Sequence, residues 1–244
     1  MNALLTIARS VLADAGRRKV VWVVLVFSAV LAFAVPSLPS YGQGVVGAVF
    51  REVTLSLMFA AAVVVALALS ATRIPGELER RTVFCLLARD VRRWHYVVGT
   101  WLGMFAVIGA VLLAFTIVSI LVGYLTYSEI MLQLFAGSFA IWLEMGALMA
   151  LAVLMSTRFG VMTSIVGALA FLFIGHSING LVAPGGGAGP VWWLPSLEIF
   201  NVISPVAHGG GYGLVYASAM VVAFVAWSAA LLAGASASFG GRDL

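Results

Sequence analysis

The sequence predicts an all-α integral membrane protein, and its composition is the first reason. Of its 244 residues, 63% are hydrophobic and only 9% are charged, and the mean hydropathy is +1.14. A soluble domain of this size needs more polar side chains to cover its surface, so most of this surface must face lipid. The single cysteine, Cys85, excludes an internal disulfide and a metal site built from cysteines.

The second reason is the length of the apolar runs. A helix needs about 20 mostly apolar residues to cross the hydrocarbon core of a bilayer. Six runs meet that length, which predicts six transmembrane helices within one transmembrane domain over residues 1–244. They lie near Val20–Leu38, Val53–Thr72, Tyr96–Val122, Ile130–Met155, Val161–Val182 and Leu214–Ser236.

The third reason is the placement of positive charge. If both termini are cytoplasmic, twelve of the thirteen Lys and Arg residues fall in cytoplasmic segments, and only Arg51 falls outside. Because Lys and Arg concentrate on the cytoplasmic side of membrane proteins, this orientation is favoured over its reverse. The basic residues lie beside apolar runs, so the pI near 9.6 reflects topology. We expect membrane lipid, and no nucleic acid, as a partner.

Residues 1–19 predict an amphipathic helix at the cytoplasmic membrane interface. Its apolar residues recur at helical spacing, at Leu4, Leu5, Ala8, Val11, Leu12 and Ala15. A frayed leader is the alternative. The basic residues 17–19, the apolar run after them and Ala32-Phe33-Ala34 also imitate a signal peptide, whose cleavage would leave five spans. We expect the first span to be retained.

A charged segment at residues 73–95 separates the predicted second and third spans. Pro75-Gly76 predicts a break in the helix of the second span, because proline interrupts helical hydrogen bonding. Glu77 and Glu79 would then open a short helix along the membrane face, since acids at a helix start complement its dipole. Such an elbow is a natural docking surface for a soluble partner. A charged loop that only fixes topology is the alternative.

This segment resembles the cytoplasmic stretch of type-2 ABC exporter permeases. The matching residues are Ile74, Glu77, Glu79, Thr82, Leu86-Leu87-Ala88, Arg93 and Gly99. In that family the stretch forms a coupling helix that sits in a groove of the ATPase subunit. The resemblance implies that the ATPase would contact Glu77, Glu79, Arg80, Arg81, Thr82, Arg89 and Arg93. The chain departs from the family pattern at Arg81, Asp90 and Thr100.

The resemblance extends over nearly the whole chain, including the N-terminal helix, the six spans, Trp193–Asn201 and residues 241–244. It implies a permease subunit of an ATP-driven exporter in a bacterial cytoplasmic membrane, paired with a second permease subunit. Two cytoplasmic ATPase subunits would bind the ATP and Mg²⁺. This chain has no phosphate-binding loop, because the glycine tract at residues 185–190 lacks the required lysine. We expect no catalytic residue, cofactor or metal site in it.

Glu144 is the only acid well inside a predicted span. It lies about 14 residues from Arg158, or roughly 21 Å along a helix, near the middle of the bilayer. A carboxylate there costs about 2.5–3.5 kcal/mol, so it should face the bundle interior and be paired or protonated. Two roles remain open: a polar group that lines a substrate path or senses protons, and a hydrogen bond that locks two helices together.

His176, in the next predicted span, is the candidate partner of Glu144. The two would meet if their helices pack antiparallel, and Asn179 lies one turn farther along on about the same face. These three residues form a candidate intramembrane polar site. The alternative function is a proton-coupled secondary transporter that uses Glu144. We find no inverted repeat between the two halves of the sequence, which speaks against that alternative.

The predicted extracytoplasmic segment, residues 183–213, is long for a simple connection. Trp192 and Trp193 suit the headgroup region of a membrane, and we expect a short interfacial or re-entrant helix around Ser196–Asn201. This segment would form either an outer gate or a connector that lies on lipid. We favour the connector.

Overall fold

The computed structural model describes residues 3–17, 26–27, 29–30, 42–79, 93–181 and 196–240. Every element within these ranges is helical, as the sequence predicts. The elements are α1 (Ala3–Arg17), α3 (Gly42–Glu79), α5 (Arg93–Tyr127), α6 (Gln133–Ser156), α7 (Val161–Leu181), the short 3-10 helix η1 (Leu197–Phe200), α8 (Ile203–Ala207) and α9 (Leu214–Gly240).

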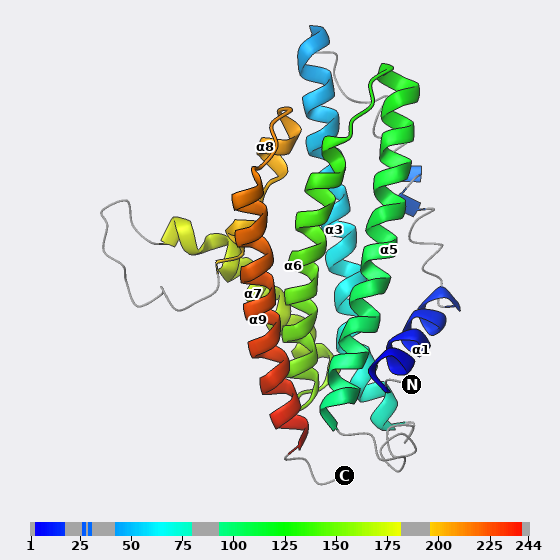
Figure 1. Cartoon of the computed structure of the whole chain (residues 1–244), viewed down its shortest axis with the longest axis vertical. Coiled ribbons are helices and arrows are strands. Elements are labelled where there is room, and N and C mark those ends of the chain that lie inside the picture. Colours follow the sequence, from blue (N-terminus) through cyan, green and yellow to red (C-terminus); the bar gives the residue numbers. More distant parts are fainter. Residues whose placement is uncertain are drawn as a thin grey trace.

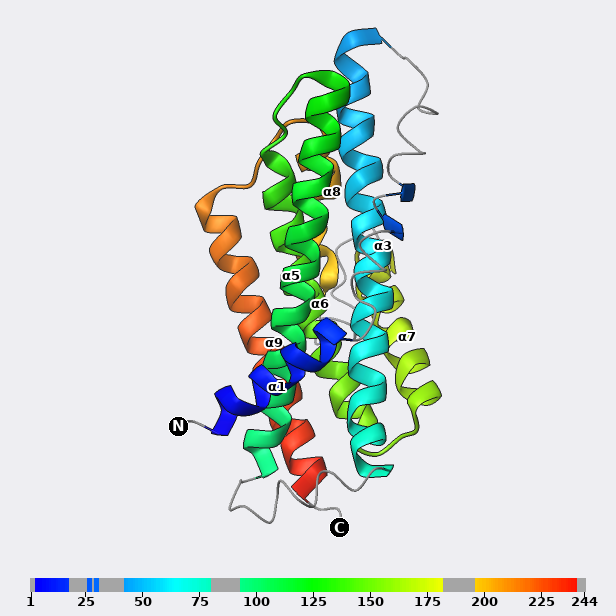
Figure 2. The ribbon, with the colours of Figure 1, turned by 90° about the vertical axis from the view of Figure 1, so that its right-hand side faces the viewer.

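Four long helices, α3, α5, α6 and α9, run side by side along the long axis of the molecule (Figures 1 and 2). α6 is the central helix, because it packs against α3, α5, α7 and α9. The turn between α5 and α6 lies beside the start of α3, at what we call the turn end. The end of α3 and the end of α9 lie near α1 at the opposite end, the α1 end (Figure 2).

Four of the helices are long and apolar enough to cross a membrane, and they correspond to the predicted second, third, fourth and sixth spans. They expose large apolar side chains such as Leu113, Leu121 and Val222, as a surface in contact with lipid requires. This indicates a membrane protein. The predicted fifth span is helical as α7, of which Val161–Ser177 is a shorter apolar helix. The predicted first span lies largely outside the described residues, so a total of six spans stays a prediction.

α3 and α5 are longer than the spans predicted for them. α3 has 38 residues, which at 1.5 Å per residue is about 57 Å, whereas the hydrocarbon core is about 30 Å thick. The prediction started this span at Val53 because Arg51 and Glu52 interrupt the apolar run, but the helix begins at Gly42. The length of an apolar run shows how much of a helix lies in the hydrocarbon core. The helix itself can extend beyond that run at both ends.

The predicted helix break at Pro75-Gly76 is wrong, because α3 continues through both residues to Glu79. A proline inside a helix removes only one backbone hydrogen bond directly, the one to the carbonyl four residues earlier. Pro75 lies near the helix end, and the preceding residue, Ile74, is fully buried and anchors the last turns in the bundle. Glu77 and Glu79 therefore extend α3 instead of opening a separate helix.

The N-terminal amphipathic helix predicted over residues 1–19 is confirmed as α1, which lies obliquely across α5 (Figure 2). Ile7 and Val11 are buried. A Cβ atom added to Gly103 of α5 would lie 2.6 Å from Val11 Cβ and 2.9 Å from the Ala8 carbonyl oxygen, so only glycine permits this close approach. Leu12 is 45% exposed although it belongs to the predicted apolar face. The placement of α1 at the membrane interface stays a prediction.

Stacked aromatic rings fix the face of α6 that meets α5. The rings of Phe105 and Trp142 are nearly parallel, with centroids 4.3 Å apart. Trp142 Nε1 donates to the Phe105 carbonyl at 2.9 Å, and Trp101 Nε1 donates to the Gly146 carbonyl at 3.0 Å. Indole N–H groups buried in an apolar bundle need such partners. Because residues 142 and 146 hold this side of α6 against α5, the helix presents Glu144 elsewhere.

Candidate functional site

The segment that carries η1 and α8 joins α7 to α9 in the chain. It packs against the bundle formed by the longer helices. Its buried side chains are Leu197, Phe200, Val202, Val206 and Ala207. The short helix predicted around residues 196–201 is present as η1. Residues 197–207 pack against protein instead of lying on lipid, whereas residues 183–195 of the predicted connector lie outside the described residues. Apolar side chains at this spacing fit a surface facing protein as well as one facing lipid, and here they pack on α3, α6 and α7.

Three hydrogen bonds hold this segment in place. Arg51 Nε of α3 donates to the Ala207 carbonyl at 2.8 Å. The hydroxyl of Tyr212 donates to the Ala136 carbonyl of α6 at 2.8 Å, and that of Tyr216 donates to the Ile199 carbonyl at 2.8 Å. Burial raises the pKa of Tyr212, so its hydroxyl keeps the proton that it donates at neutral pH.

A close approach between α7 and η1 places His176 beside this segment. A Cβ atom added to Gly175 would lie 2.7 Å from Leu197 Cγ. The glycine thus lets η1 pack directly on the backbone of α7, one residue before His176. His176 also packs against α3, where the ring of Phe59 meets it edge to face with centroids 5.8 Å apart.

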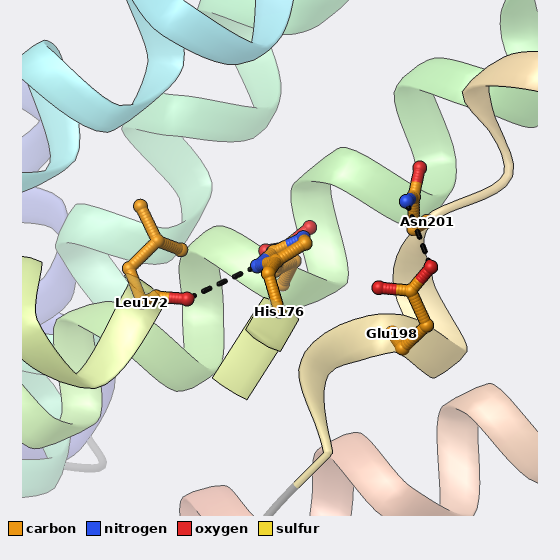
Figure 3. A network of polar contacts seen from close by, with 5 residues as sticks. Leu172, His176, Glu198 and Asn201 are labelled. Atoms are coloured by element: carbon orange, nitrogen blue, oxygen red, sulfur yellow. Dashed lines mark hydrogen bonds and ion pairs between the residues drawn. The ribbon is translucent and has the colours of Figure 1, made fainter. Parts of the chain in front are cut away.

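Glu144 and His176 are in contact, as the sequence predicts. His176 Nε2 lies 3.4 Å from Glu144 Oε1, and the two side chains are 27% and 2% exposed. The other ring nitrogen, Nδ1, is 3.1 Å from the Leu172 carbonyl oxygen of the preceding turn (Figure 3). Glu144 Oε1 has no hydrogen bond of good geometry within the described part of the chain. The pair is a contact between α6 and α7 in which Glu144 is buried and His176 is partly exposed.

Glu198 and Asn201 belong to the same polar cluster, and sequence reasoning missed them as site residues. Asn201 Nδ2 donates to Glu198 Oε1 at 3.0 Å (Figure 3). Glu198 lies in η1, which packs on α6 and α7, the helices that carry Glu144 and His176. The signal in the sequence was Glu198 itself, the only acid in residues 183–213. The sequence around Glu198 did not indicate that η1 folds back onto α7.

The third residue of the predicted polar site, Asn179, lies in α7 one turn beyond His176, and its side chain is outside what the structure describes. Among the described residues, no three His, Cys, Asp or Glu side chains are grouped so that they could hold a metal ion. The cluster is therefore an acid, a histidine, a second acid and an amide around a buried contact. Its chemistry is the binding and exchange of protons and hydrogen bonds.

Three of the predicted coupling residues lie in described helices, at the α1 end and away from this cluster. Glu77 and Glu79 are in the last turn of α3, and Arg93 is the first residue of α5. Arg80, Arg81, Thr82 and Arg89 lie outside the described residues. Glu144 is twelve residues before Ser156, the last residue of α6, so the cluster is about 18 Å from the α1 end of that helix. The molecule thus has two separate candidate sites.

Comparison with known proteins adds no assignment. No family model matches the sequence, and no curated protein is significantly similar to it. The resemblance to type-2 ABC permeases therefore stays a prediction from motifs. Membrane character and the buried polar cluster rest on the residues and geometry of the chain itself.

Proposed function

We propose that the chain is the permease subunit of an ATP-driven ABC exporter in a bacterial cytoplasmic membrane, with six spans and both termini inside. The observation that carries the proposal is the segment between Glu79 and Arg93, which has the charged motif of such permeases and joins the ends of two long apolar helices. Two permease subunits would line the path. Two ATPase subunits would bind the ATP and Mg²⁺ that this chain has no motif to bind.

The continuity of α3 suggests how movement of an ATPase would reach the membrane. The helix runs unbroken from Gly42 to Glu79, so a displacement of its last turn is carried along a rigid element of about 57 Å. Near its other end, Arg51 holds α8 through the Ala207 carbonyl. Closure of the ATPase pair would thus bias α8 and η1 between two arrangements, which is the kind of two-state change that coupling requires.

The composition of the protein interior indicates only a broad class of substrate. Most of the buried side chains are apolar, which suits lipids, amphipathic molecules or hydrophobic peptides. Systems that handle ions or metallo-cofactors use similar permeases by the same resemblance.

Co-purification tests the proposal. We expect an ATPase encoded beside this chain to co-purify with it, and to be lost when Glu77→Arg and Arg81→Glu reverse the charges of the motif. Glu129→Lys is the matched control, because Glu129 is exposed and lies at the turn end, beside Gly47 at the start of α3. The proposal fails if the charge reversal and the control retain the ATPase equally, or if no ATPase associates with the unaltered chain.

A second candidate function is a secondary transporter driven by protons, and the contact between Glu144 and His176 favours it. Purified protein in liposomes would separate the two. A pH gradient alone, with no ATPase present, should move no solute if the chain is an ABC permease. Solute movement under these conditions that disappears in Glu144→Gln would favour the second candidate.

A further inference from the structure

The tautomer of His176 is set by its own helix. Nδ1 lies 3.1 Å from the carbonyl oxygen of Leu172, and a carbonyl oxygen can only accept a hydrogen bond. Nδ1 therefore carries a proton and donates it to Leu172. In neutral histidine the other nitrogen, Nε2, is then an acceptor with a lone pair, and it donates only when the ring is doubly protonated.

Whether the contact between Nε2 and Glu144 Oε1 is favourable depends on how many protons the pair holds. The two atoms are 3.4 Å apart. With no proton between them, two lone pairs face each other beside a buried carboxylate, and both the repulsion and the burial of charge are unfavourable. With two protons, the pair carries a net positive charge beside a buried carboxyl group, which is unfavourable. One proton gives a neutral pair, either as imidazolium with carboxylate or as imidazole with carboxylic acid.

Within the part of the chain that the structure describes, His176 is the side chain in contact with Glu144 that can carry a positive charge. On the packed elements that the structure describes, the other ionisable groups include Arg51, Glu52 and Arg73 of α3, Arg158 after α6, Glu198 of η1, Tyr212 before α9 and Tyr216 in α9. Arg51 is bonded to the Ala207 carbonyl, and the two tyrosines are bonded to carbonyls. Glu198 is an acid that accepts a hydrogen bond from Asn201, so it supplies no positive charge to this site.

We propose that Glu144 and His176 form a proton-binding site that holds one exchangeable proton, either on the Glu144 carboxyl or on Nε2 of His176. η1 packs on α7 beside this site, where Leu197 meets Gly175, and the His176 side chain is 27% exposed. The proposal goes beyond transport driven by ATP, because it depends only on the contact between α6 and α7. A failure of the ATPase to associate would leave it untouched.

Proton release on unfolding tests the proposal. In an unfolded chain a glutamate titrates near pH 4.3 and a histidine near pH 6.5. At about pH 8 the unfolded pair holds no proton and the folded pair holds one, so unfolding in mixed micelles should release one proton per chain from this site. Because the unfolded state binds fewer protons, stability falls as pH rises, and the unfolding equilibrium constant rises about tenfold per pH unit above about pH 7.

Glu144→Gln removes the titrating acid and keeps the shape of the side chain. Its amide N–H can donate to Nε2, so the contact survives without an exchangeable proton. At about pH 8 this variant should release one proton fewer per chain than the unaltered protein. Glu198→Gln, the same substitution on the neighbouring acid, is the matched control and should not reduce the release. Protons from the other histidines, His95 and His208, cancel in this comparison.

Equal proton release from the unaltered protein and Glu144→Gln at about pH 8 would overturn the proposal. If Glu144→Gln does not fold, His176→Gln takes its place. The acid then keeps its proton in the folded bundle, so release is already seen at about pH 5.5, where the unaltered pair releases none. Identical release from His176→Gln and the unaltered protein at both pH values would be equally contradictory.

Discussion

α6 and α9 are nearly equal in hydropathy, yet the protein covers them very differently. In the most apolar window of each helix, 72% of the residues of α6 are buried, against 17% of those of α9. Buried residues occupy all sides of α6. Those of α9 form one stripe with a spacing of three or four residues, at Met220, Phe224, Ser228, Leu232, Ala235 and Phe239. Hydropathy identifies a transmembrane helix, but it does not say whether protein or lipid surrounds it.

The difference in burial between α6 and α9 explains why the polar cluster lies on α6. A carboxyl group inside a membrane is tolerated only where protein and not hydrocarbon surrounds it. Glu144 lies on α6, the helix with neighbours on all sides, whereas α9 carries no acidic or basic residue at all. The open side of α9 is instead made of exposed apolar residues such as Val222 and Val225. Those positions suit contact with lipid.

Small residues let neighbouring helices approach α6 closely. A Cβ atom added to Gly146 would lie 2.6 Å from ring carbons of both Phe105 and Phe224. On α9 the equivalent atom of Gly234 would meet Leu154 at 3.6 Å, an ordinary contact. Helix interfaces in membranes depend on such small residues, because lipid is as apolar as the side chains and packing is the main attraction.

Gly146→Ala should have the largest effect, a loss of about 1–3 kcal/mol of unfolding free energy, because the added methyl group overpacks two aromatic rings. Gly234→Ala, the control on α9, should be neutral or stabilise by up to about 1 kcal/mol through helix propensity. Unfolding in mixed micelles measures both. Equal losses from the two substitutions would contradict the contrast between a covered and an open helix.

Tyr212→Phe should have a smaller effect, about 1 kcal/mol, since it removes only the hydrogen bond from this segment to α6. The pKa of Tyr212 is raised by burial, so its contribution is present at neutral pH and is lost as pH rises through that value. The difference in stability between the unaltered protein and Tyr212→Phe should therefore shrink in strong alkali. Tyr124→Phe is the control, because Tyr124 is 52% exposed. An equal loss from Tyr124→Phe would argue that the bond to Ala136 contributes nothing.

The helices and the central contact could be predicted from the sequence, because both follow from local patterns. The fourth and fifth predicted spans match α6 and α7 within three residues at each end, since charged or turn residues bound them. The contact between Glu144 and His176 followed from the rise per residue on two helices joined by a short turn.

What the sequence could not predict depends on contacts between distant segments. The burial of Ile74 helps α3 to continue past Pro75, and the approach of Leu197 to Gly175 brings η1, which carries Glu198, onto α7. Neither partner can be identified from spacing along the chain. The coupling residues 80–82 and 89 lie outside the described residues, so their arrangement stays a prediction.

The central claim is that Glu144 and His176 interact inside a region covered by protein, and a double-mutant cycle tests it most directly. We predict that Glu144→Ala and His176→Ala together lose less stability than the sum of the two single losses, with a coupling of about 0.5–3 kcal/mol. A parallel cycle between Glu144 and His208, which is exposed and bonded to the Ser204 carbonyl, should be additive. Strictly additive losses for Glu144 and His176 would contradict the account.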